Sequence, residues 1–236
     1  MERDRAALES LLAPLEVRTP DPAFDVLTNV WLKYQAMSGR VWGRTGYFQP
    51  GGAFGFRDQL QDSHVFLPLE PEHTLKQILL HAAHQFTDGT AYHWWHPLTE
   101  EGHKKPYNDD LLWLPFVMLN YLRETADLPA LERSVPFLDP DGRVSSDTGT
   151  LYEHCRRAID SMWTRIGPHG VPLMGAGDWN DGLSAIGLEL RPRACGSPIS
   201  SSASSTIGSS SSAGGPCPTR TPRPATRASR MRCARR

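Results

Sequence analysis

The sequence predicts an all-α fold, a barrel or toroid of helical hairpins, and three observations support this prediction. Several long segments repeat apolar residues every three or four positions, as one face of a helix does. Few stretches alternate apolar and polar residues as strands do. The connecting loops are long and rich in Gly, Pro, His and aromatic residues; they span 39–58, 87–108, 127–148 and 167–187. An up-and-down bundle would use connections of a few residues, so these loops favour a toroid with its site on loops at one end.

Four segments carry the helical period. They predict helices within 21–40, 70–86, 108–127 and 149–167. Asp21 followed by Pro22 is a good N-cap and first-turn pair for the first helix. Asn108 or Asp109 can cap the third helix, and Pro115 is expected to kink that helix or end its first part. These helices are the expected framework of the toroid.

Composition divides the chain into a lead-in over residues 1–20, an acidic body over 21–189 and a basic tail over 190–236. All 26 acidic residues and all seven tryptophans precede residue 190. Nine of the 25 basic residues, all of them Arg, lie in the tail, which leaves 16 basic against 26 acidic groups and a formal net charge of −10 before it. An acidic body argues against a nucleic-acid partner, because phosphate contacts need Lys and Arg. It suits a neutral, hydroxyl-rich ligand.

Cysteine usage and the first residues indicate where the protein works. Three of the four cysteines lie in the tail and only Cys155 lies in the body, which is no disulfide framework and favours a reducing compartment. The opening "MERDRAALES" is charged and lacks the apolar core of a secretory signal. No apolar run approaches the roughly 18 residues that span a bilayer. We therefore expect a cytoplasmic protein without a membrane segment.

The tail over 190–236 is rich in Ser, Pro, Arg and Gly without periodicity, and we expect it to be disordered. One interpretation is a basic tail that touches nucleic acid or membrane. A second is that the reading frame slips near Arg191, because "CGSPISSS" with suitable codons reads as an apolar helical sequence in another frame. Resequencing the gene distinguishes the two.

The segment "GAGDWNDGLSAIG" is the strongest candidate for chemistry. An Asx-turn before a helix would explain Asp178, Asn180 and Asp181, but it does not explain the large apolar Trp179. A calcium loop is a weaker alternative, since the spacing of oxygen ligands does not fit an EF-hand. In the functional interpretation Asp181 is a proton donor and Trp179 a wall for a sugar ring, because glycosidic cleavage needs an acid to protonate the departing oxygen.

Two further segments add candidate ligand-binding residues. In "GGAFGFRDQLQD", the glycines let backbone approach a ligand, and Arg57, Asp58 and Asp62 supply charged groups for sugar hydroxyls; the alternative is an Arg–Asp ion pair at a helix start. The segments "DGTAYHWWHP" and "YNDDLLWLP" gather aromatic, His and Asp side chains. They place His93, Trp94, Trp95, His96, Asp109, Asp110 and Trp113 within a short span. The alternatives are a core position for Trp94 and Trp95 and a helix cap for Asp109.

A metal or cofactor is not expected. The spacing of His81, His84, His93 and His96 could suit zinc, but no Cys or Glu completes a familiar zinc motif. A nucleophile elbow, a phosphate-binding P-loop and a dinucleotide fingerprint are all absent from the sequence. Any chemistry is therefore expected from side chains and co-substrate alone.

Taken together, these motifs resemble glycoside hydrolase family 94. The resemblance rests on "YQAMSGRVWGRTGYFQPGGAFGFRDQLQD", "HAAHQFTDGTAYHWWHP", "DDLLWLP", "LYEHC" and "GVPLMGAGDWNDG", which cover most of residues 25–187. The family includes glycoside phosphorylases and the C-terminal part of cyclic β-1,2-glucan synthases. The motifs "GGAFGFRDQLQD" and "LYEHC" look closest to the synthase branch. The resemblance implies an (α/α)6 barrel and inverting phosphorolysis of a β-glucosidic bond, with inorganic phosphate as co-substrate and no cofactor.

The resemblance also implies roles for individual residues. The family's general acid falls on Asp181 with Trp179 beside it, and a sugar-binding carboxylate falls on Asp58 next to Arg57. The family's phosphate-binding residues lie further along, where the tail stands here. We therefore expect a partial barrel that is inactive by itself, acts in its full form on a β-linked oligosaccharide or glucan, and is compatible with a homodimer.

Two rival functions remain open at this point. One is an inverting glycoside hydrolase on a similar toroid, with Asp58, Asp62 or Asp109 as the base beside Asp181, because hydrolysis needs a second carboxylate to activate water. The other is a non-catalytic carbohydrate-binding protein. Sugar identity and linkage, β-1,2 or β-1,4 and glucose or N-acetylglucosamine, are also open.

Overall fold

The computed structural model describes residues 5–6, 9–10, 12–13, 15–41, 52–167, 169–173, 175–177 and 179, and of residues 39–41 the backbone alone. The predicted tail over 190–236 and the predicted acid Asp181 lie outside these residues. Within the described ranges, no helix is both long and apolar enough to cross a membrane.

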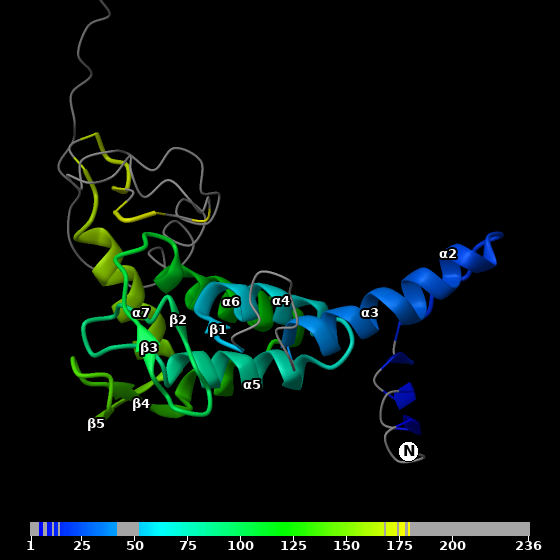
Figure 1. Cartoon of the computed structure of the whole chain (residues 1–236), viewed down its shortest axis with the longest axis horizontal. Coiled ribbons are helices and arrows are strands. Elements are labelled where there is room, and N and C mark those ends of the chain that lie inside the picture. Colours follow the sequence, from blue (N-terminus) through cyan, green and yellow to red (C-terminus); the bar gives the residue numbers. More distant parts are fainter. Residues whose placement is uncertain are drawn as a thin grey trace, which may run out of the picture.

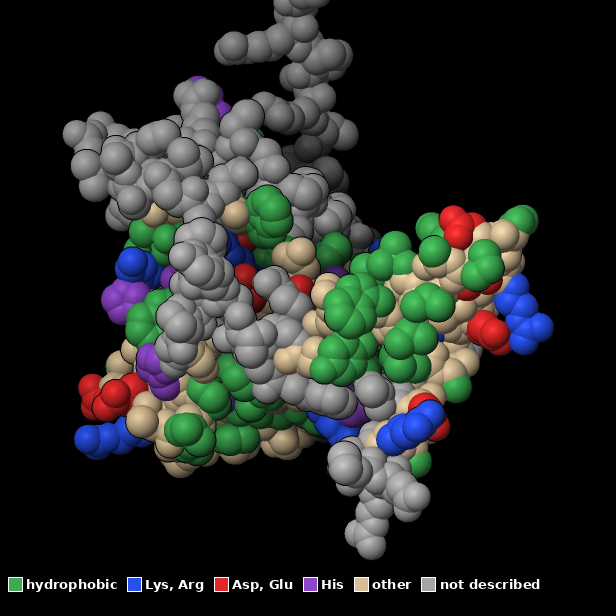
Figure 2. Space-filling model, turned by 45° about the vertical axis from the view of Figure 1, so that its right-hand side comes forward, with side chains coloured by type: hydrophobic (Ala, Val, Ile, Leu, Met, Phe, Trp, Pro, Cys, Tyr) green, Lys and Arg blue, Asp and Glu red, His purple; other side chains and the backbone are tan. Residues whose placement is uncertain are grey.

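The first predicted helix forms an arm that projects from the body (Figure 1). It runs through α2 (Pro22–Val26), η1 (Leu27–Trp31), α3 (Leu32–Gln35) and η2 (Ala36–Val41). Asp21 caps it as predicted, because its side chain accepts hydrogen bonds from the backbone N–H groups of Ala23 and Phe24. Figure 2 shows hydrophobic side chains gathered along this arm. Trp31, which lies on the arm, is half exposed.

The other three predicted helices form the body together with a fourth that the sequence analysis placed partly in a loop. They are α4 (Phe56–Ser63), which continues as η3 (His64–Phe66), then α5 (Pro71–Ala82), α6 (Asp110–Thr125) and α7 (Leu151–Trp163). Helix α6 packs against α4, α5 and α7 (Figure 1). It continues through Pro115 to Thr125 and ends at Ala126, whose φ of 56° is left-handed.

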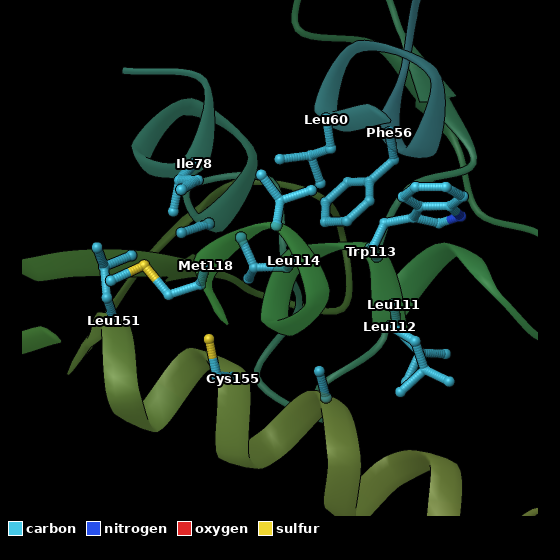
Figure 3. Packing of buried hydrophobic residues seen from close by; sticks show 14 of the residues in the cluster. Phe56, Leu60, Ile78, Leu111, Leu112, Trp113, Leu114, Met118, Leu151 and Cys155 are labelled. Atoms are coloured by element: carbon cyan, nitrogen blue, oxygen red, sulfur yellow. The ribbon is translucent and has the colours of Figure 1, made fainter. Parts of the chain in front are cut away.

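The core is centred on α6, which is buried around most of its circumference because it has neighbours on several sides. Four consecutive residues, 111–114, are buried, which a helix with one apolar face would not show. Figure 3 shows Leu114 and Met118 of α6 between Leu60 and Ile78 on one side and Cys155 on the other. Burial raises the pKa of Cys155 to about 12, so this thiol packs as an apolar group.

Two small antiparallel sheets correct the all-α prediction. One pairs β1 (Phe54–Gly55), β2 (Trp94–Trp95) and β3 (Gly102–His103), and the other pairs β4 (Ser134–Leu138) with β5 (Val144–Thr150). A short 3-10 helix, η4 (Leu128–Glu132), precedes β4. The strands escaped prediction because β1 to β3 are two residues long and β5 is almost entirely polar. Helices form most of the core, and strands β2 and β4 add Trp95, Val135 and Leu138 to it. The sheets also shape the connections that carry functional residues.

Candidate active site

Arg57 is the centre of a buried polar group at the start of α4. Helices α4 and α6 begin at the same end of the body, which brings Arg57 of one beside Asp109, the residue before the other. The Nη1 of Arg57 donates to both carboxylate oxygens of Asp109, at 3.1 and 3.2 Å. The indole Nε1 of Trp113 donates to the same carboxylate at 3.1 Å. Arg57 is 5% exposed and Asp109 2%, so the pair is shielded from water.

Asp110 and His93 extend this group. The Nδ1 of His93 lies 2.9 Å from Oδ2 of Asp110, and the Nε of Arg57 lies 4.0 Å from Oδ1 of Asp110. The ring of His93 stacks on Tyr107, with centroids 4.0 Å apart and planes 6° from parallel. The backbone N–H of Phe56 donates to the carbonyl of His93. The connection between α5 and α6 is therefore tied to the first turn of α4.

Burial disfavours the charged forms of the two carboxyl groups, Asp109 and Asp110. It raises the pKa of Asp109 to about 6, with the neighbouring Asp110 adding to the rise and Arg57 opposing it. Burial likewise raises the pKa of Asp110, and the hydrogen bond from His93 opposes that rise. Among the described residues, none makes a hydrogen bond to Oδ1 of Asp110. Two carboxylates thus share one guanidinium, which makes Arg57 the cation on which the stability of the group depends.

The loop that carries Trp179 is fastened to this group by backbone contacts. The N–H of Asn108 donates to the carbonyl of Gly177 at 2.9 Å, and the N–H of Ala176 donates to the carbonyl of Pro106 at 3.1 Å. Tyr107 and Gly175 also pair as an isolated antiparallel bridge. Segment 175–177 therefore runs alongside residues 106–108, which lead directly into Asp109 and Asp110.

Two glycines are required for this docking. Gly175 has a φ of 66°, and a Cβ there would overlap the carbonyl oxygen of Pro106. A Cβ at Gly177 would lie 2.7 Å from the ring of Tyr107. Arg165 also holds residues 106–108 in place, because its Nη1 donates to the backbone carbonyl of Tyr107 at 3.0 Å. The close approach of the loop thus depends on small residues at two alternate positions.

Trp179 reaches α4 at the end of this loop. Its Nε1 donates to Oε1 of Gln61 at 3.2 Å, and its side chain is half exposed. Gln61 lies one helical turn after Arg57 and Asp58, so it shares their side of the helix. The aromatic ring of Trp179 therefore lies on the side of α4 that carries Arg57 and Asp58.

The structure brings most of the predicted site residues together. Arg57, Asp109 and His93 form one group, and the partly buried Asp58 and Asp62 lie one turn apart on the same helix as Arg57. Trp94 lines a different pocket, together with Tyr92 and His96. Tyr107, Gly175 and Gly177 were absent from the predicted site. The only sequence signals for them were an aromatic residue before "NDD" and the spacing of the glycines in "GAG".

Hydrogen bonds and ring contacts account for the four histidines with zinc-like spacing. His81 and His84 both pack against Trp95, and Nε2 of His84 lies 2.7 Å from a carboxylate oxygen of Glu100. Burial lowers the pKa of His81 to about 3, which keeps its ring neutral. Among the described residues, no three side chains of His, Cys, Asp or Glu come together as metal ligands.

Comparisons with known protein sequences show which family the chain belongs to. The chain is 39% identical over 201 residues to the cyclic beta-(1,2)-glucan synthase NdvB of Rhizobium meliloti (strain 1021), covering 79% of this chain and 7% of that protein. It is 32% identical over 180 residues to the solabiose phosphorylase of Paenibacillus borealis, covering 73% of this chain and 20% of that protein. It is 27% identical over 205 residues to the N,N'-diacetylchitobiose phosphorylase of Vibrio furnissii, covering 75% of this chain and 25% of that protein.

The chain therefore spans a quarter or less of the length of each of these relatives. Residues 8–210, which match a family sequence model, nevertheless include every described residue of the Arg57 group and of the Trp179 loop. The sequence model of the Glycosyl hydrolase 94 superfamily, catalytic domain, matches residues 8–210, and this chain belongs to that family of carbohydrate-active enzymes.

Proposed function

We propose that the chain carries the sugar-binding and proton-donating part of an inverting glycoside phosphorylase site. Such a site cleaves or forms a β-glucosidic bond with phosphate or α-glucose 1-phosphate. One observation carries the proposal. The Arg57 group and Trp179 both contact the same side of α4. Helices α4 to α7 are, in this proposal, consecutive parts of an (α/α)6 barrel within residues 21–189.

Arg57 and Asp58 are proposed to hold the hydroxyls of the glucosyl unit. Charged donors and acceptors make stronger hydrogen bonds to hydroxyls than neutral groups do. Asp109, whose carboxylate also accepts a hydrogen bond from Trp113, fixes the guanidinium of Arg57 before any ligand arrives, so little ordering cost is left to the binding step. Because Arg57 and Trp113 already bind its carboxylate, Asp109 acts through Arg57 and is a positioning residue.

Asp181 is proposed as the general acid. It follows Trp179 by two residues, and because consecutive Cα atoms are about 3.8 Å apart, its Cα lies within about 8 Å of that of Trp179. The acid transfers its proton to the bridging oxygen as the bond from that oxygen to the anomeric carbon breaks. Phosphate attacks the anomeric carbon from the opposite face and forms the new C–O bond, which inverts the configuration.

The hydrolase alternative requires a second carboxylate that activates water. Asp109 is poorly suited to that role, because Arg57 and Trp113 bind its carboxylate and almost none of it is exposed. The names of two of the relatives, both phosphorylases, also favour a phosphate-dependent reaction. A phosphate anion needs no base to make it a nucleophile, so one acid is sufficient.

The proposal is tested by incubating the full chain with β-1,2- and β-1,4-linked glucose disaccharides, with and without phosphate, and by measuring binding of the same disaccharides. We expect binding without turnover, since the resemblance implies phosphate-binding residues beyond Asp181 that the tail replaces. Asp58→Asn should weaken binding at least about tenfold, whereas the exposed Asp160→Asn on α7 should leave it unchanged. Cleavage without phosphate would indicate a hydrolase, and binding that is insensitive to Asp58→Asn would refute the site.

A further inference from the structure

A pocket of about 860 Å³ lies beside the strand segment that carries His93, on the opposite face of that segment. Tyr92, Trp94 and His96 line it, and successive side chains of a strand point to opposite faces. His93 and Trp95 therefore point the other way, and they do so toward Asp110 and the core respectively. The turn between β2 and β3 and the turn between β4 and β5 form the other walls, through residues 99–102 and 141–144.

The walls of this pocket are held in place before any ligand binds. Gly102 and Gly142 leave room for Tyr92, since a Cβ at Gly102 would lie 2.7 Å from its ring and one at Gly142 would overlap its hydroxyl. Glu100, at the turn, adopts a left-handed φ of 59° and its carboxylate is bonded to His84. Non-glycine residues hold that conformation only where their surroundings fix it, and such positions are frequent at ligand sites.

The chemistry of the lining selects a neutral, hydroxyl-rich ligand. The ring of Trp94 lies against His103, 5.5 Å between centroids, and its neighbour His96 adds a second aromatic edge at 5.4 Å. Glu101, Asp141 and Arg143 add acceptors and donors at the rim. The lining residues include three that carry a carboxylate, Glu100, Glu101 and Asp141, and one that carries a guanidinium, Arg143, so we expect the pocket to disfavour anions such as phosphate or a sugar phosphate.

We propose that this pocket is a second saccharide-binding site, which takes a segment of neutral β-linked glucan. The choice of glucan rests on the proposed function. The pocket is distinct from the candidate active site, because neither Arg57 nor Asp109 lines it and its strand residues alternate with His93. A second site of this kind holds a long chain on the domain while one end is processed.

The test is a calorimetric titration of the full chain with linear glucan pentasaccharides, β-1,2-linked in one series and β-1,4-linked in another. Trp94→Ala should weaken one binding event at least about tenfold, and Trp94→Phe should retain most of its affinity. Leu98→Ala is the matched control, because Leu98 is 97% exposed on the same turn and does not line the pocket. Val144→Trp, at a 72% exposed position of the wall, should fill the pocket and weaken the same event without disturbing the core.

The outcomes separate this site from the candidate active site. If Asp58→Asn leaves the Trp94-dependent event intact, the pocket binds glucan whether or not the proposed function holds. If only Asp58→Asn weakens binding, or if the pentasaccharides do not bind at all, the second site does not exist. Displacement of the Trp94-dependent event by α-glucose 1-phosphate would contradict the assignment of a neutral ligand. Far-UV circular dichroism shows whether the Trp94→Ala variant is folded. If that variant is unfolded, the effect of Val144→Trp on binding decides whether the pocket binds glucan.

Discussion

Arg57→Ala is expected to destabilise the chain by about 3–5 kcal/mol at pH 8, or to prevent folding altogether. The reason is that Asp109 and Asp110 would remain buried without their shared cation, and removing one partner of a buried ion pair costs about that much. Urea-induced unfolding followed by Trp fluorescence measures the loss. Arg156→Ala is the matched control: its guanidinium also makes short ion pairs, with Glu153 and Asp160, but it is half exposed and should cost less than about 1 kcal/mol.

The loss of folding stability caused by Arg57→Ala should become smaller as the pH falls. The pKa of Asp109 is raised to about 6 with Arg57 present, and it rises further without it. A carboxyl group whose pKa is higher in the folded state than in the unfolded state favours folding at low pH, and that contribution disappears as pH rises through the folded pKa. Arg57→Ala should therefore be closer to wild type at pH 5 than at pH 8. Adding Asp109→Asn should recover part of the stability at pH 8, and a loss that is equal at both pH values would contradict this account.

Gly175→Ala is expected to detach the loop that carries Trp179. The new Cβ would overlap the backbone oxygen of Pro106, which cannot move aside as a flexible side chain could. Amide hydrogen exchange at Asn108 and Ala176, whose N–H groups bond across the two segments, should accelerate at least about tenfold. Affinity for a β-linked disaccharide should fall by a similar factor, because Trp179 would no longer be held beside Gln61.

Gly170→Ala is a matched control for that experiment. Gly170 has a φ of 74°, close to the 66° of Gly175, so alanine meets the same backbone strain at either position. Among the described residues, leaving out its two chain neighbours, no atom lies within 4 Å of a Cβ at Gly170. The difference between the two variants therefore isolates the collision with Pro106. Equal exchange rates at Asn108 in the two variants would show that the close approach does not hold the loop.

The sequence predicted the helices well because their physical signals are local. Asp21 and Pro22 begin the first helix as their capping chemistry requires, and apolar spacing of three and four residues marks α5 and α7. Pro115 does not end the helix, which was one of the two expectations for it. Helix α6 continues to Thr125, because other helices hold it on several sides and this packing outweighs the missing backbone hydrogen bond.

The candidate site was predictable in its residue types but not in its arrangement. Arg57 and Asp109 stand out as charges among apolar and glycine residues, yet nothing in the sequence shows that they pair across 52 positions. That pairing arises because α4 and α6 begin at the same end of the body. Trp94 and His93 are adjacent in sequence and were predicted to share a site, but strand alternation sends them to opposite faces.

The most direct test of the central claim is a crystal structure of the full chain with a β-linked glucose disaccharide, and the quantity to measure is the distance from a carboxyl oxygen of Asp181 to the bridging oxygen. We expect a hydrogen bond of about 2.5–3.0 Å, with the glucosyl ring between Trp179 and the side of α4 that carries Arg57 and Asp58. A disaccharide bound in that place with the carboxyl group of Asp181 turned away from it would contradict the proposed acid, and a disaccharide bound nowhere near α4 would contradict the site itself.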